Sequence, residues 1–275
     1  MALRTPSRRR RDPEGRMPLG SHLRELRDRV VKAAVAVLLG AVAGWFLKDP
    51  VLAALAAPLE EAASEAGRAG EVTLNLGNLT GILDLQIKVS IVLGIIASSP
   101  VWLYQLWAFI TPGLTRREKR TTVAFVGTAV PLFLAGSGLA FLVLPNAVSF
   151  FVDLTPQGFV NVIDASTYIG FFLRIIVAFG LAFVTPVVLV GVNFVGLLPA
   201  RTMLRAWRWV IVLCFAFAAV ATPTPDALTM FLLALPMCGL FFAAIGIAAL
   251  NDRRRARRDR DEGYGGLSDD EVSPL

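Results

Sequence analysis

Two acidic residues, Glu25 and Glu118, lie among basic residues at the edges of long apolar runs. Glu25 stands within Ser21–Arg29, directly before an apolar run that begins at Val30, and Glu118 stands within Arg116–Arg120. A carboxylate can accept two parallel hydrogen bonds from one guanidinium, whereas a lysine ammonium offers only a point charge. The two acids could therefore bind two arginines and reject two lysines. Alternatively, each acid only offsets the charge of its arginine neighbours.

The residues around the two acids allow both a binding role and a structural one. Arg27 lies two positions after Glu25 and does not share its helix face, so we expect no direct pair between them. Arg27 and Arg29 either hold the helix end in water or orient the acid. Gln105 and Phe109 are four residues apart on one helix face near the same side. These two residues either pack in an aromatic belt at the membrane interface or contribute to a binding site.

The apolar composition predicts an all-α integral membrane protein that positions these residues. Of the 275 residues, 55% are hydrophobic. They come in runs of roughly 20, the length that crosses a hydrocarbon core of about 30 Å. In a soluble chain the net charge of +6 would suggest a nucleic-acid partner. Here the basic residues gather on one side of the predicted membrane, so we expect no such partner.

Six transmembrane helices are predicted within a membrane domain at residues 21–251. Residues 1–20 and 252–275 are predicted to be disordered tails, since they are charged and rich in Pro or Gly. The fifth span has about 13 residues and would measure roughly 20 Å, less than the hydrocarbon core. The predicted spans are 30–47, 81–110, 122–144, 168–195, 209–221 and 227–250.

The basic residues predict the orientation of these spans. Most of them fall in the N-terminal region before and at the start of the first apolar run, in the loops at 111–121 and 199–208, and in the C-terminal tail, while the alternate segments hold only Lys48 and Arg68. Because basic loops stay in the cytoplasm, both termini are predicted to be cytoplasmic.

The residue inventory argues against several classes of chemistry. His22 is the single histidine, and Cys214 and Cys238 both lie inside apolar runs. We therefore predict no metal site, no disulfide framework, no cofactor and no enzymatic activity. An ion- or solute-coupled secondary transporter is the alternative function. It would need ionisable groups at mid-membrane depth, and the middles of the six runs contain essentially none.

Several motifs, in order along the chain, make it resemble the TatC family, the multispanning core of the twin-arginine protein translocase. The resemblance covers about residues 21–251. It rests on His22-Leu23-x-Glu25-Leu26-Arg27-x-Arg29, on Ala57-Pro58-Leu59, on Pro100–Leu114 followed by Glu118, and on Thr222-Pro223-x-Pro225-Asp226.

The resemblance implies a bacterial cytoplasmic-membrane protein whose six helices form a curved, concave wall. It implies recognition of signal peptides with two consecutive arginines on the cytoplasmic face. It also implies export of folded proteins by the proton motive force, in an oligomeric complex with single-span partners of the TatA and TatB type, surrounded by membrane lipid. The residues that it assigns to signal-peptide binding are Glu25, Glu118, Phe109, Gln105 and Arg27.

Four further residues are expected to have structural or partner-contact roles. Pro58 is expected to fix a turn or a helix start, Asp226 to cap the sixth span, and Asp164 to lie in an external segment. Many relatives carry a glutamate where this chain has Val184, and Thr185 is the neighbouring group that could donate a hydrogen bond instead. Outside these motifs, Lys88 and Arg174 lie just inside two spans, where long side chains can reach the interface.

Overall fold

The structure is a computed structural model that describes residues 19–67, 70–77, 79–110, 118–156, 160–221 and 227–261. Helices dominate these residues, and the apolar segments expected from the sequence are all helical. In chain order the elements are α1 (Leu19–Glu65), β1 (Val72–Asn75), α2 (Leu79–Ala97), α3 (Ser99–Ile110), α4 (Glu118–Asp153), β2 (Asn161–Asp164), α5 (Ala165–Val195), α6 (Ala200–Arg205), α7 (Trp207–Ala221) and α8 (Ala227–Asp261).

The helices have the length and the surface of membrane spans. Among the described residues, α1, α2, α4, α5 and α8 are long and apolar enough to cross a bilayer, and α7 is a shorter apolar helix. Large apolar side chains face outward, as at Leu39, which is 67% exposed. Such a surface is stable in lipid and not in water. The prediction of an all-α membrane protein is confirmed.

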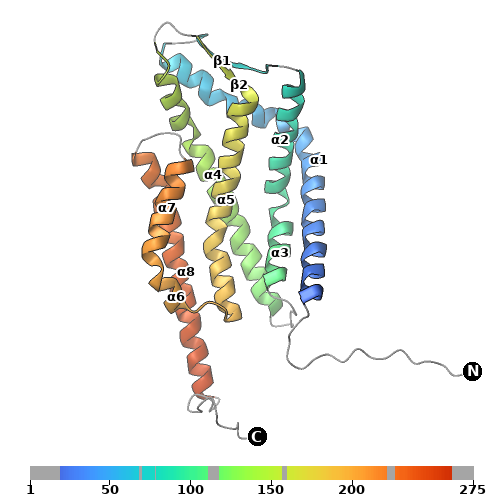
Figure 1. The fold of residues 1–275 in the computed structure, drawn as a ribbon, viewed down its shortest axis with the longest axis vertical. Helices are drawn as coiled ribbons and strands as arrows, with labels where there is room; N and C mark the ends of the chain where they lie inside the picture. Colours follow the sequence, from blue (N-terminus) through green and yellow to red (C-terminus); the bar gives the residue numbers. More distant parts are fainter. Residues whose placement is uncertain are drawn as a thin grey trace, which may run out of the picture.

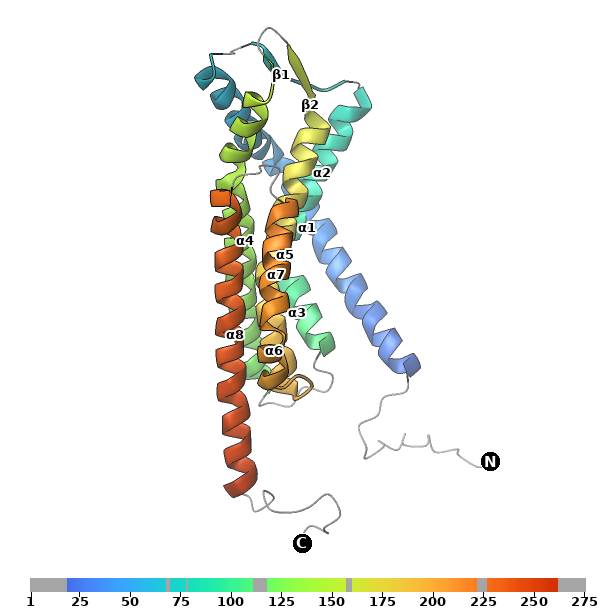
Figure 2. The ribbon, with the colours of Figure 1, turned by 60° about the vertical axis from the view of Figure 1, so that its left-hand side comes forward.

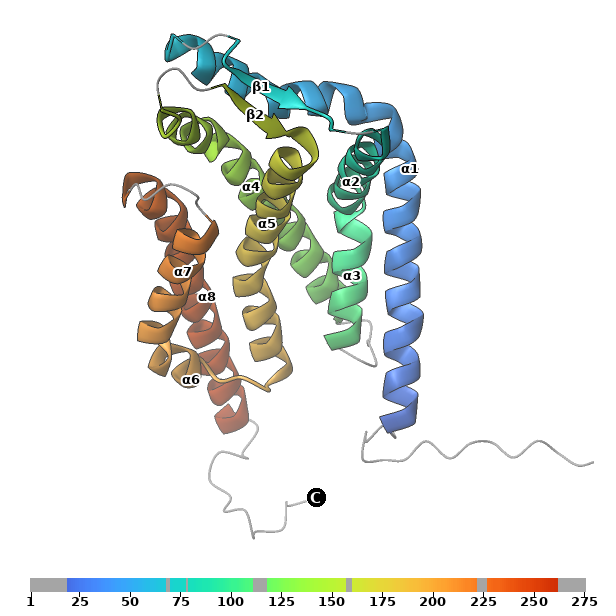
Figure 3. The same ribbon diagram turned by 45° about the horizontal axis from the view of Figure 1, so that its top comes forward.

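The bundle has two distinct ends. β1 and β2 lie together at one end, which we call the strand end (Figures 1 and 3). The first residues of α1 and the last residues of α8 lie at the opposite end, which we call the basic end (Figure 1). α2 and α5 both begin at the strand end and run in the same direction (Figure 3).

α1 bends across the strand end instead of stopping after its first span. Figure 3 shows the C-terminal part of the helix lying over the tops of α2 and α5. Pro50 and Pro58 both lie inside this helix. A proline in a helix interior removes a backbone hydrogen bond and favours a bend. The prediction that Pro58 fixes a turn or a helix start is wrong. Pro58 lies buried within the part of α1 that covers the strand end.

The segment predicted as one long span, 81–110, is two helices placed end to end. α2 stops at Ala97 and α3 begins at Ser99. Pro100 lacks an N–H group and its ring clashes with the carbonyl four residues earlier, so the break falls just before it. The chain still continues in one direction through both helices (Figure 1).

Besides α1, two helices extend well beyond their predicted C-terminal ends. α4 continues through Pro145 to Asp153, nine residues beyond the predicted end at 144. Its added part is apolar on one face and buries Val148 and Val152 in the core at the strand end. α8 includes residues 252–261, which we expected to be disordered, and it extends beyond the other helices at the basic end (Figure 2).

The two short strands were not predicted. Val72–Asn75 pairs in parallel with Asn161–Asp164, with Val72 opposite Asn161. The strands are about 90 residues apart in sequence, so their pairing arises only when α1 and α4 both reach the strand end. Beneath them the hydroxyl of Tyr168 donates to the carbonyl of Leu55 at 3.2 Å, which ties α5 to α1.

Glycines allow α1 and α2 to pack closely within the membrane. Gly40 and Gly44 are one helical turn apart on α1, and a Cβ on Gly40 would lie 2.8 Å from the carbonyl oxygen of Gly94 on α2. A Cβ on Gly94 would lie 2.5 Å from the backbone nitrogen of Ala41. Small residues at such contacts let backbones approach, which is how helices commonly associate in lipid.

Candidate functional site

The predicted acid Glu25 is held by an arginine of its own helix. Arg29 donates from Nε to Oε1 of Glu25 at 3.0 Å, and its Nη2 donates to the same oxygen. Both side chains are about one-fifth to one-quarter exposed, at 21% and 24%. Both bonds fall on Oε1, and no hydrogen bond between the described residues reaches the second carboxylate oxygen, Oε2. Of the two predicted roles for Arg29, the geometry supports orientation of Glu25.

Arg27 does not contact Glu25, as its helix position predicts. Its guanidinium pairs with Asp28 at 2.7 Å, and both side chains are more than half exposed, at 69% and 53%. An exposed ion pair of this kind contributes little to stability. Arg27 is therefore free to exchange Asp28 for another anionic or polar group.

His22 and Phe109 stack on each other and join α1 to α3. The ring centroids are 4.6 Å apart and the planes are inclined by 22°. This contact brings the residues around Glu25 next to the predicted residues of α3. Gln105, one turn before Phe109, is half-buried on the same helix. We predicted no contact for His22 from the sequence, although its place in the same short motif as Glu25 was a signal.

Trp107 fixes the end of α3 on which Phe109 lies. It is 2% exposed, its indole Nε1 donates to Thr122 Oγ1 at 3.0 Å, and its ring stacks on Phe125 at 4.3 Å. A Cβ on Gly191 would lie 2.2 Å from the same ring, so α5 leaves room for it. This packing sets the position of Phe109 two residues later.

Two predicted site residues are not located by side chain. Glu118 is the first residue of α4, but its side chain lies outside the described part of the chain. Asp226 lies in 222–226, also outside the described residues. The proposed pairing of Glu25 with Glu118 in one site stays a prediction.

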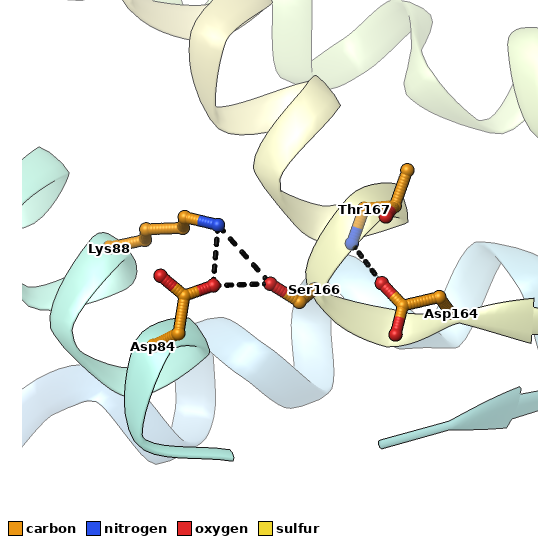
Figure 4. A network of polar contacts seen from close by, with 5 residues as sticks. All are labelled: Asp84, Lys88, Asp164, Ser166 and Thr167. Atoms are coloured by element: carbon orange, nitrogen blue, oxygen red, sulfur yellow. Dashed lines mark hydrogen bonds and ion pairs between the residues drawn. The ribbon is translucent and has the colours of Figure 1, made fainter. Parts of the chain in front are cut away.

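Asp164 and Thr185 both form hydrogen bonds with backbone groups of α5. Asp164 caps α5, since its carboxylate accepts from the backbone N–H of Thr167 at 2.7 Å (Figure 4). Hydrogen bonding by the side chain of Thr167, and then by its backbone N–H, lowers the pKa of Asp164 below its ordinary value of 3.8. The hydroxyl of Thr185 donates to the carbonyl of Leu181 at 3.1 Å, within its own helix. Val184 beside it is 3% exposed in an apolar cluster with Trp107 and Phe133.

A polar network at the basic end was missed entirely. Asn193 is 1% exposed, and its Nδ2 donates to the carbonyl of Leu198 at 2.8 Å and to Asp252 Oδ1 at 2.9 Å. Asp252 Oδ2 accepts from the backbone N–H of Ala200 at 2.8 Å, and Asn251 donates to Asn193 Oδ1 at 3.0 Å. We call these five residues the Asn193 network. It joins α5, α6 and α8, and an asparagine inside an apolar run was its sequence signal.

A second unpredicted network joins α2 to α5 near the strand end. Asp84 Oδ2 accepts from Lys88 Nζ at 2.5 Å and from Ser166 Oγ at 2.6 Å (Figure 4). Lys88 Nζ also lies 3.2 Å from Ser166 Oγ. The spacing of Asp84 and Lys88 by four residues could have suggested the pair, but the link to α5 depends on the fold.

The arrangement of the described residues suits recognition better than bond-breaking chemistry. No group of three or more His, Cys, Asp or Glu side chains within the described ranges could hold a metal ion. Cys214 and Cys238 are buried free thiols on α7 and α8. The basic end instead presents one oriented carboxylate, an exposed guanidinium and a stacked pair of rings.

Comparisons with known proteins agree on one family. A family model described as Sec-independent protein translocase protein (TatC) matches residues 21–236. The Sec-independent protein translocase protein TatC of Xylanimonas cellulosilytica is 50% identical over 243 residues, which cover 88% of this chain and 87% of that protein. TatCy of Bacillus subtilis is 32% identical over 254 residues, covering 90% of this chain and 96% of its own.

Solved structures agree with the sequence comparisons. A crystal structure of the twin arginine translocase receptor TatC matches with a TM-score of 0.66 and 33% identity, over 84% of this chain and 100% of that chain. A second crystal structure of TatC, in DDM, matches with a TM-score of 0.67 and 32% identity, over 82% of this chain and 99% of that one.

Proposed function

Because the chain belongs to the TatC family of Sec-independent protein translocase proteins, we propose that it is the translocase subunit that binds twin-arginine signal peptides. Its membership makes it a multi-pass membrane component of a Tat translocase. The receptor role is supported by a TatC crystal structure that is described as a twin arginine translocase receptor. It is also supported by the chemistry at the basic end.

The proposal rests on the carboxylate of Glu25, whose Oε1 is bound by Arg29. Arg29 holds Oε1 and thereby fixes the side chain, while Oε2 can accept from an incoming guanidinium. A hydrogen bond to an ionised group contributes on the order of 1–3 kcal/mol. Arginine gains more than lysine here, because its planar fork can span both oxygens when Arg29 yields part of its contact. Glu118 is proposed to bind the second arginine in the same way.

The neighbouring residues are proposed to receive the rest of the signal peptide. Phe109 and Gln105 lie next to the Glu25 helix through the His22–Phe109 stack, which offers an apolar ring beside a polar amide. Arg27 can contact a peptide carbonyl or carboxylate by giving up its exposed pair with Asp28. Binding at this corner would keep the peptide at the interface, with apolar helix faces close by.

Orientation and energy source are proposed on the same basis. If α2 with α3 and the short α7 each cross the membrane, the chain makes six crossings and both termini are cytoplasmic at the basic end. The cytoplasmic membrane of a bacterium is the proposed location. Single-span proteins of the TatA and TatB type are the proposed partners in an oligomeric complex, with folded precursor proteins as cargo. The proton motive force is the proposed driving force.

The test is the affinity of the detergent-solubilised full chain for a twin-arginine signal peptide and for the same peptide with two lysines. Wild type should prefer arginine, and Glu25→Ala and Glu118→Ala should each reduce that preference. Glu60→Ala is the matched control, since Glu60 is an exposed acid of the same helix that lies in its C-terminal part, at the strand end. Equal binding of both peptides by wild type would contradict the receptor proposal.

A further inference from the structure

A groove between α2 and α5 combines two cations with an apolar floor. The groove has a volume of about 400 Å³, and its part nearer the strand end is lined by Lys88, Gly170 and Arg174. Ile95 and Leu181 line it further from the strand end, and the rest of its described lining is apolar. Leu181 is 47% exposed, so the groove opens sideways, toward the space that lipid occupies.

The two cations sit at the same depth and flank one glycine. Each lies nine residues after the first residue of its helix, Leu79 for α2 and Ala165 for α5, a rise of about 14 Å. A Cβ on Gly170 would lie 3.9 Å from Arg174 Nη2 and 3.9 Å from Lys88 Cδ. Because Gly170 has no side chain, the space between the cations is open.

Lys88 has an acidic partner among the described residues, whereas Arg174 has none. Lys88 is paired with Asp84, and its ammonium has three donors, of which Asp84 and Ser166 take two. Arg174 makes no ion pair with a described carboxylate. Asp84, Lys88 and Arg174 together carry one net positive charge, and Asp164, which caps α5, lies within electrostatic range of Lys88.

The depth of Arg174 matches the boundary between headgroups and acyl chains. From Arg174 to Val195, the last residue of α5, the helix rises about 32 Å. The hydrocarbon core is about 30 Å thick. With the end of α5 at one boundary, Arg174 lies at the other, where lipid phosphates are found and where an unpaired guanidinium is least costly.

We propose that this groove binds an anionic phospholipid from the leaflet at the strand end. The phosphate lies between Lys88 and Arg174, over Gly170, and one acyl chain follows Ile95 and Leu181 toward the bilayer centre. A headgroup with one net negative charge gives Arg174 the anionic partner that no described carboxylate provides. This inference rests on the groove alone and does not depend on the proposed receptor function.

A carboxylate from a partner helix is the competing occupant, and the groove favours it less. A buried acid on a helix would leave much of the apolar lower part of the groove to be filled by the same helix at a fixed register. A lipid supplies the anion and a flexible chain in one molecule, and it is present at high concentration at this depth.

The test is native mass spectrometry of the detergent-solubilised full chain with added dioleoylphosphatidylglycerol or dioleoylphosphatidylcholine. Wild type should retain phosphatidylglycerol in preference to phosphatidylcholine. Arg174→Gln should weaken phosphatidylglycerol binding about fivefold, the effect of one basic residue at a membrane surface, and Arg174→Lys should retain most of it. Arg174 is exposed, so its substitution leaves the core intact.

Two more variants separate charge from shape. Gly170→Leu places a side chain between the cations without changing charge and should block both lipids. Lys48→Gln removes a cation of α1, outside the groove, and should change neither affinity. Equal phosphatidylglycerol binding by wild type, Arg174→Gln and Gly170→Leu would overturn the proposal. A second outcome would also overturn it. If Arg174→Gln binds phosphatidylglycerol as wild type does but no longer binds an acidic single-span peptide, the groove is the site of a partner helix.

Discussion

Two acids at the basic end have similar sequence surroundings and opposite situations in the fold. Glu25 is followed by Arg27 and Arg29, and Asp252 is followed by a run of arginines. Asp252 has both oxygens occupied, by Asn193 of α5 and by the backbone of Ala200. Glu25 has one oxygen occupied, by a residue of its own helix.

The difference teaches what makes a charged residue available for binding. Asp252 joins three helices, so any ligand that competed for it would have to break the fold locally. Among the described residues Glu25 pairs only with Arg29 of its own helix turn, so a ligand that binds Glu25 disrupts part of one ion pair. An acid surrounded by arginines is thus a candidate receptor group only where other elements leave it a free oxygen.

The largest expected effect is on peptide binding at Glu25. Glu25→Gln should weaken twin-arginine peptide binding by about 1–3 kcal/mol, roughly 5–150-fold, because the charge that attracts guanidinium is lost. The fold should tolerate this change, since the amide keeps an oxygen for Arg29. Isothermal titration with the purified chain measures it. Asp252→Asn is the comparison variant, and a similar loss of peptide affinity there would break the distinction between the two acids.

The next largest effect is on export and follows from the short length of α7. α7 has 15 residues, about 22 Å of helix, and should thin the bilayer or tilt its neighbours. Adding four or five leucines within Trp207–Ala221 should impair export of a twin-arginine cargo while leaving peptide binding intact. An export assay in cells, with binding measured in parallel, tests this. Normal export by the lengthened chain would remove the short helix from the mechanism.

A third effect is on stability at Asp252. Asp252→Ala should lower the unfolding free energy by about 1–3 kcal/mol, because the buried amide of Asn193 and the N–H of Ala200 each lose an acceptor. Thermal unfolding in detergent measures the change. Glu25→Ala should shift the unfolding midpoint less. The reverse order would mean that Glu25 is the structural acid.

The smallest effect is at the strand end and depends on pH. The pKa of Asp164 is lowered in the folded protein by hydrogen bonding to the side chain and the backbone N–H of Thr167, so its stabilising contribution is present above 3.8. It is lost as the pH falls through the lower, folded-state pKa. Asp164→Asn should therefore lower the unfolding midpoint slightly at pH 7, and the gap to wild type should close in acid. A gap that grows in acid would contradict the cap.

The sequence by itself determined the class of the protein and its candidate residues. Apolar runs of membrane length can be satisfied only by helices, because lipid offers no hydrogen bonds to the backbone. Ordered motifs, among them His22–Arg29, indicated the TatC family, which the comparisons confirm. The helix spacing also argued against a pair between Arg27 and Glu25, while it left open whether Arg29 anchors the helix end or orients Glu25.

Only the tertiary structure decided how the ends of these helices are used. The bend of α1, the extension of α4 and the pairing of β1 with β2 all arise where segments distant in sequence meet at the strand end. The side chains that other helices bring close decide how polar groups are used. They occupy both oxygens of Asp252, whereas the described residues occupy only one oxygen of Glu25, and they leave open space at Gly170. Hydrophobic periodicity is a local property, whereas the satisfaction of a polar group is set by contacts between elements.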